Sequence, residues 1–186
     1  MKIIGLISCV ALLGSALAVP ATVAADTRFE GRAKTHVTAQ LKEAKEKSYK
    51  LSKNADALNA ITRSRDLAWQ SHASYLNSVR DDVNQLGKMF AALEEVKHDA
   101  SAPQQVAIED SKVRLQRTAD SISEAIALLN DRTRNVYFSD YGEAVQSINE
   151  HTRSLHETLD AIVKLEDAKA GFEKLDLGIV ANLVDH

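Results

Sequence analysis

The chain is poor in cysteine, proline and aromatic residues. Its 186 residues include one cysteine, two prolines and one tryptophan. Because Cys9 lies near the amino terminus, the chain after it has no thiol for a disulfide or a thiolate metal site. The chain also has no Asn-x-Ser/Thr glycosylation acceptor. These absences favour a bacterial protein over a eukaryotic secreted one.

Motifs that carry enzyme or cofactor chemistry are also missing. The sequence has no Gly-rich phosphate loop, no Gly-x-Ser-x-Gly elbow, no His-Glu-x-x-His helix and no Cys-x-x-Cys-His haem site. A net charge of −3 argues against nucleic acid as a partner. We therefore expect a protein that is not an enzyme and that has no cofactor.

The first 25 residues have the composition of a cleavable signal peptide. An apolar stretch covers residues 3–19, and small residues follow it up to Ala25. This pattern predicts cleavage after Ala25 and a periplasmic or secreted location in a bacterium, with no membrane contact afterwards. A cut after Ala18 is the second choice. An uncleaved anchor and lipidation at Cys9 are further alternatives.

The rest of the chain is dominated by residues with high helix propensity, and its apolar residues recur three or four positions apart. This periodicity predicts amphipathic helices along four stretches. Their apolar faces comprise Phe29, Ala33, Val37, Leu41, Ala44 and Leu51; His72, Leu76, Val79, Val83, Leu86, Phe90 and Leu93; Ile108, Leu115, Ala119, Ile122, Ile126, Leu129 and Val136; and Val145, Ile148, Leu155, Leu159, Ile162, Leu165 and Phe172.

Only some of the connections between these stretches are marked. Ser101, with Pro103 two residues later, predicts the start of the third helix, with Ser101 as N-cap. The first turn could lie near Asn54 or near Ser64. A turn near Ser64 gives helices of similar length, which favours an all-α, antiparallel up-down-up-down four-helix bundle. The alternative is an extended helical hairpin in which the first helix continues to Leu93.

We expect residues 26–175 to form this bundle domain. Gly178 is a candidate for the end of the last long helix. Residues 176–186 would then be a tail, folded as a short capping helix or used to bind a partner.

Three groups of residues are candidate sites. His72 lies one turn from Trp69 and Tyr75 and could bind a small ligand or haem, although a core histidine hydrogen-bonded to a neighbour also fits. His156 and Asp160 are four residues apart and share a helix face, so with His151 nearby they are weak metal candidates.

The third group is an aromatic cluster at the expected turn between the last two helices. It consists of Tyr137, Phe138 and Tyr141. Such a cluster either closes the end of a bundle or, if exposed, binds a partner.

The sequence thus favours a non-enzymatic periplasmic protein with a structural or protein-interaction role. Its partner would be another protein or a second copy of the chain. The alternative is a four-helix bundle that binds a small ligand, a metal ion or haem.

Overall fold

The computed structural model describes the backbone of residues 22–63, 68–131 and 139–184, and the side chains within 35–63, 68–131 and 140–175. It contains helices α1 (Thr22–Ile61), α2 (Trp69–Glu95), α3 (Ala102–Asp131) and α4 (Ser139–Val184), with a short 3-10 turn, η1 (Lys97–Asp99). These ranges contain no β-strand, and the all-α prediction is confirmed. The predicted signal peptide lies almost entirely outside the described residues.

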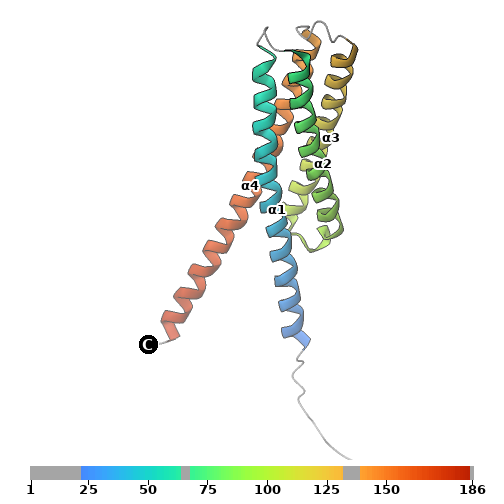
Figure 1. The fold of residues 1–186 in the computed structure, drawn as a ribbon. Coiled ribbons are helices and arrows are strands. Elements are labelled where there is room, and N and C mark those ends of the chain that lie inside the picture. The colour runs from blue at the N-terminus through green and yellow to red at the C-terminus, as the bar shows by residue number, and fades with distance from the viewer. Residues whose placement is uncertain (1–21, 64–67, 132–138, 185–186) are drawn as a thin grey trace, which may run out of the picture.

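The four long helices form an antiparallel bundle in which each runs opposite to the next (Figure 1). α1 packs against α2 and α4, and α3 packs against the same two helices. Cross-helix contacts agree with this direction: Lys45 pairs with Asp160, and the later residue Asp56 accepts a hydrogen bond from the earlier residue Asn149. The predicted bundle is confirmed, and the extended hairpin is wrong because α1 and α2 are separate antiparallel helices.

The first turn lies near Ser64 rather than near Asn54. α1 continues through Asn54, whose side-chain amide donates to Asp82 Oδ2 of α2 at 2.5 Å, and the next residue, Ala55, is fully buried. Thr62 follows the end of α1 at Ile61, and its hydroxyl donates to the carbonyl of Asn59 at 2.7 Å. The polar residues around position 54 therefore hold two helices together instead of forming a loop.

The third helix begins where predicted, but its cap differs from the expected one. The backbone N–H of Ser101 donates to Gln104 Oε1 at 2.8 Å, as in one half of a capping box. The Ser101 hydroxyl is buried and has no hydrogen-bond partner among the described residues. Gln104 also donates from Nε2 to Thr38 Oγ1 of α1 at 2.9 Å. Gln104 therefore links the start of α3 to α1, a role that no sequence motif predicted.

Most of the predicted apolar faces form the core, but the end of the fourth does not. The second face, from His72 to Leu93, is entirely buried. In α4 the buried face ends at Val163, and Leu165 and Phe172 are 43% and 70% exposed. Assigning these two residues to the core was therefore wrong.

A change of register explains this difference. Leu155, Leu159 and Ile162 follow the seam between α4 and its neighbours, and the next positions at this spacing are Glu166 and Lys169. One helical residue turns by about 100°, so Leu165 lies well away from the seam. Charged positions cannot continue an apolar seam.

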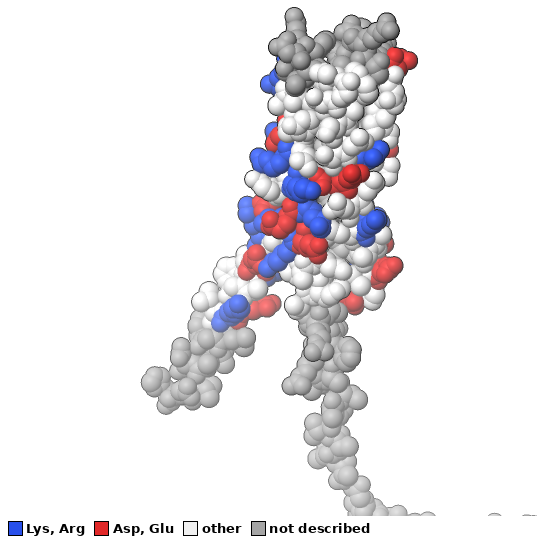
Figure 2. All heavy atoms as spheres, viewed as in Figure 1, with Lys and Arg blue, Asp and Glu red and all other residues white. Residues whose placement is uncertain are grey.

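Beyond this point α4 diverges from α1 and protrudes from the bundle (Figure 1). It runs without interruption through Gly178 to Val184, so the expected separate capping helix does not form. Basic and acidic side chains lie intermixed around the point where α4 leaves α1 (Figure 2), where Lys42 pairs with Asp167 at 2.7 Å. Within the described residues, no helix has the length and hydropathy needed to cross a membrane.

Candidate functional site

His72, the predicted ligand-binding histidine, lies in the core and pairs with Tyr141. Its Nδ1 is 3.2 Å from the Tyr141 hydroxyl, and the two rings meet edge to face with centroids 5.5 Å apart. Burial lowers the pKa of His72 and raises the pKa of Tyr141. His72 Nε2 is buried and has no partner among the described residues. The pair therefore links the first turns of α2 and α4 in uncharged form at neutral pH.

The other two members of this predicted site lie elsewhere. Trp69 and Tyr75 are exposed, whereas His72 between them is fully buried. Each lies three residues from His72, which turns it about 60° to one side or the other of His72 on α2, so both flank the buried face at its edges. The structure therefore does not assemble His72, Trp69 and Tyr75 around one cavity.

The aromatic cluster is only partly described. Tyr137 and Phe138 lie outside the described residues. Tyr141 is buried in its pair with His72. Tyr141 thus helps to close this end of the bundle, which is the first of the two interpretations given above, and it is not exposed for a partner.

The metal candidates on α4 have other partners. His156 Nδ1 is 3.1 Å from Ser48 Oγ. Asp160 pairs with Lys45 at 3.0 Å and Lys164 at 2.6 Å, and these two ammonium groups hold the pKa of its carboxyl below its usual value.

His151 is half-buried. In the described part of the chain, no three His, Cys, Asp or Glu side chains come together in a way that could hold a metal ion. The structure thus does not bring His151, His156 and Asp160 into one ligand set.

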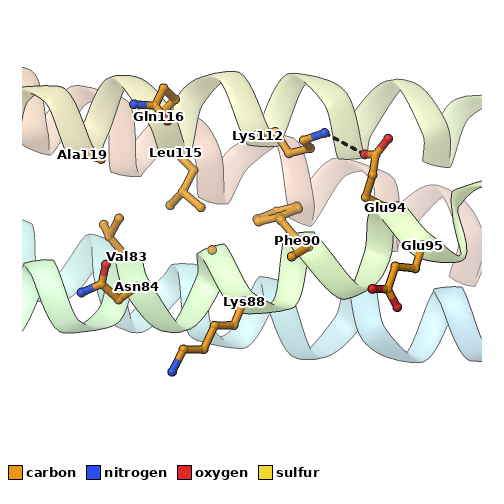
Figure 3. Close-up of a pocket in the computed structure, with 12 residues that line it drawn as sticks. Val83, Asn84, Lys88, Phe90, Glu94, Glu95, Lys112, Leu115, Gln116 and Ala119 are labelled. Atoms are coloured by element: carbon orange, nitrogen blue, oxygen red, sulfur yellow. Dashed lines mark hydrogen bonds and ion pairs between the residues drawn. The ribbon is translucent and has the colours of Figure 1, made fainter.

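A groove of about 800 Å³ lies between α2 and α3 (Figure 3). Val83 and Phe90 of α2 and Leu115 of α3 point into the space between the two helices. The full lining comprises Val83, Asn84, Gly87, Lys88, Phe90, Ala91, Glu94, Glu95, Lys112, Leu115, Gln116 and Ala119. We call this feature the α2–α3 groove.

Small residues keep the α2–α3 groove open. Gly87 and Ala91 lie one turn apart on α2, and Ala119 faces the groove from α3. A Cβ atom added at Gly87 would meet nothing within 4 Å. Glycine inside a helix costs about 1 kcal/mol relative to alanine. Packing within this chain therefore does not require a glycine at position 87.

The rim of the groove carries charges of both signs. Lys112 Nζ lies 2.8 Å from Glu94 Oε2 and bridges the two helices at one end, and together with Lys97 it holds the pKa of the Glu94 carboxyl below its usual value. Lys88 and Glu95 are exposed on the side of α2 that faces away from α3 (Figure 3). The groove thus has an apolar floor, one ion pair across it between Lys112 and Glu94, and further charges at Lys88 and Glu95 on the outer side of α2.

Histidines, metal ligands and catalytic motifs do not mark this groove in the sequence, so it was not among the predicted sites. The available signal was Gly87, which interrupts the most regular apolar helix of the chain. A groove also needs the facing residues of α3, and their position opposite Gly87 depends on how the helices pack. Comparison of the chain with protein-family models, with curated proteins and with solved structures gave no match.

Proposed function

We propose that this chain is an exported, non-enzymatic helical-bundle protein of the bacterial periplasm that binds an amphipathic helix in the α2–α3 groove. The observation that carries the proposal is the groove itself, an apolar hollow of about 800 Å³ between two helices of the bundle. Export is supported by the apolar stretch 3–19 and the small residues up to Ala25.

The dimensions of the groove suit a helix. Its α2 side runs from Val83 to Glu95, which corresponds to roughly 18 Å or a little over three turns at 1.5 Å per residue. An amphipathic helix placed there would bury its apolar side chains on the floor and leave its polar face in water. The charged rim would then select the orientation of the helix and its flanking residues.

A photo-cross-linking residue at position 87 tests this proposal. Gly87 lines the groove and a Cβ atom added there meets nothing within 4 Å, so benzoylphenylalanine at this position lies next to whatever the groove binds. The control position is Val113, which is half exposed on α3 and outside the groove lining. Irradiation of the exporting host should give a discrete adduct from position 87 that position 113 does not give. Identical adduct patterns from both positions, or none from either, would contradict the proposal.

A small apolar ligand in the same groove is a second candidate. The volume of the groove lies within the range of about 300–1,000 Å³ that is typical of ligand sites. Native mass spectrometry of protein purified from its host would show such a ligand as a fixed added mass. Ala91→Trp, which fills the groove, should remove that mass, whereas Val113→Trp should not.

A further inference from the structure

The part of α4 that protrudes from the bundle carries a row of apolar side chains that this chain leaves in water (Figure 1). Leu165, Phe172 and Leu175 are 43%, 70% and 64% exposed. Together with Ala168 they alternate at spacings of three, four and three residues, which is the heptad spacing of a coiled coil. We call residues 165, 168, 172 and 175 the α4 stripe.

The α4 stripe continues a groove on the outside of the bundle. A hollow of about 370 Å³ lies between α3 and α4, where Val106 of α3 is 69% exposed. Thr158 and Ala161 line its α4 side and occupy the preceding heptad positions. The sequence carries the repeat on to Ile179 and Asn182, and α4 is helical across both positions. A repeat of about three and a half heptads is long enough to indicate a coiled-coil partner.

Within the described residues, no other helix of this chain covers the α4 stripe. Thr158 of α4 donates to Asp110 of α3 at 3.1 Å, and α3 begins eight residues earlier, at Ala102. Because the two helices are antiparallel, α3 reaches only to about residue 166 of α4. α1 lies on another side, since Asp167, which pairs with Lys42 of α1, is turned roughly 120° from the centre of the stripe.

We propose that the α4 stripes of two copies of this chain pack against each other as an antiparallel coiled coil. This inference concerns a different surface from the α2–α3 groove and does not rest on the proposed function. A second copy is the partner that fits, because the order of side chains along the stripe is complementary to its own reverse.

This complementarity follows from the heptad positions. In an antiparallel pair, position a of one helix faces position d of the other, so Leu165 faces Leu175 and Ala168 faces Phe172. The two-fold axis repeats each contact. In the same register, position 179 lies opposite Ala161 and position 182 lies opposite Thr158. A large residue therefore meets a small one, two leucines meet each other, and a polar residue meets a polar one, which keeps the layers similar in volume.

A parallel pair does not have this match. It would place Phe172 against Phe172 and Ala168 against Ala168, and one distance between the helices cannot suit both layers. It would also bring Lys164 beside Lys169 on each side of the pair, as the flanking positions of a parallel coiled coil do. In the antiparallel pair Lys169 of each copy lies near the two-fold axis, and Glu166 of the same helix balances its charge at 2.9 Å.

The antiparallel pair places the two bundles end to end. Residue 166 of one copy then lies opposite residue 174 of the other, so the starts of the two α3 helices are about 12 Å apart along the axis. Two helices that touch over about 36 Å remove on the order of 700 Å² of accessible surface from each copy, close to the roughly 800 Å² per partner of a stable interface.

Engineered cysteines test the contact and its direction, because residues 26–186 contain no cysteine. One preparation of the exported chain carries Leu165→Cys and another carries Leu175→Cys, and the two are mixed and oxidised. We expect the disulfide-linked heterodimer as the main product, at least ten-fold above the yield from a mixture of Ala170→Cys and Leu175→Cys. Residue 170 lies on the opposite face of α4 from the stripe. Equal yields from the two mixtures would overturn the inference, and homodimers as the main product would show a parallel pair.

A charge placed in the stripe tests its part in self-association. Phe172→Glu should weaken self-association by at least ~50-fold, because the two-fold axis buries the new carboxylate twice. Ala170→Glu adds the same charge to the opposite face and should stay within about two-fold of the original chain. A dilution series by light scattering measures all three proteins, and far-UV circular dichroism checks that each is folded. An original chain that is monomeric throughout the series, or equal effects of the two substitutions, would overturn the inference.

This inference and the proposed function fail separately. If position 87 gives no specific adduct but the Leu165→Cys and Leu175→Cys mixture gives its heterodimer, the proposed function fails and the α4 pairing stands. If the chain is monomeric but position 87 cross-links to a partner, the α4 pairing fails and the proposed function stands.

Discussion

The two halves of α4 differ in burial although they belong to one uninterrupted helix. Leu155 and Leu159 in the first half are fully buried, whereas Phe172 and Leu175 in the second half are mostly exposed. Both halves contain apolar side chains at helical spacing, so amphipathicity alone does not decide burial. Burial depends on whether the apolar face continues the seam that α4 shares with α1 and α3.

In the second half that condition fails. Glu166 and Lys169 take the seam positions, and the apolar residues move around the helix by one position. α4 then separates from α1, and its apolar face becomes available to another molecule. A one-residue shift in register is therefore enough to turn a core face into a solvent-exposed one. Three experiments test this difference between the two halves.

Truncation of leucine should show the largest contrast between the two halves. Leu155→Ala creates a cavity in the core and should lower the free energy of unfolding by about 3 kcal/mol. Leu175→Ala removes an exposed side chain and should change the free energy of unfolding by less than about 0.5 kcal/mol. Urea unfolding at low protein concentration measures both values. Equal losses would mean that the second half packs as tightly as the first.

The buried pair of His72 and Tyr141, which links α2 to the start of α4, should make stability depend on pH through His72. Its pKa in the folded state lies below 6.5 because burial disfavours the charged ring. This group contributes no pH dependence above about pH 6.5. As the pH falls below that value, the unfolded chain takes up a proton that the folded chain does not, so stability falls with a slope of up to about 1.4 kcal/mol per pH unit.

Unfolding titrations between pH 7 and pH 5 measure this slope. His72→Leu should flatten it, whereas the control His98→Gln, which removes an exposed histidine, should leave it unchanged. Asp56 and Asp160 have lowered pKa values, so the stability that they contribute is lost only at more acidic pH, as the pH falls below about 3.8. An unchanged slope in His72→Leu would assign the effect to another group.

Glycine substitutions should give small gains in stability and still separate the groove from the second half of α4. Gly87 in the α2–α3 groove and Gly171 in the exposed second half of α4 are both helical, and an added Cβ would meet nothing at either position. Each change to alanine should raise the free energy of unfolding by about 0.5–1 kcal/mol through backbone propensity.

Binding in the groove should distinguish the two variants. Gly87→Ala places a methyl group where the proposed helix would pack and should weaken the adduct from a cross-linking residue at Asn84, which also lines the groove. Gly171→Ala lies outside the groove and should leave that adduct unchanged. The reverse order would contradict the proposed function.

Much of the fold could be predicted because its signals are local. The face from His72 to Leu93 was predicted in full, and the start of α3 near Ser101 was predicted from a serine and a proline. The candidate sites were predicted less well. His156 and Asp160 share a face of α4 as expected, but Ser48 and Lys45 of α1 take them as partners.

Local patterns in the sequence establish that the chain forms long amphipathic helices and which residues share a face, because helical periodicity depends on neighbouring residues. The packing of the helices establishes which apolar residues of α4 are buried, that His72 pairs with Tyr141, and that Gly87 and Leu115 line one groove. Each of these depends on the register between helices that are distant along the chain. That register is set by the packing of all four helices together, so no local pattern reports it.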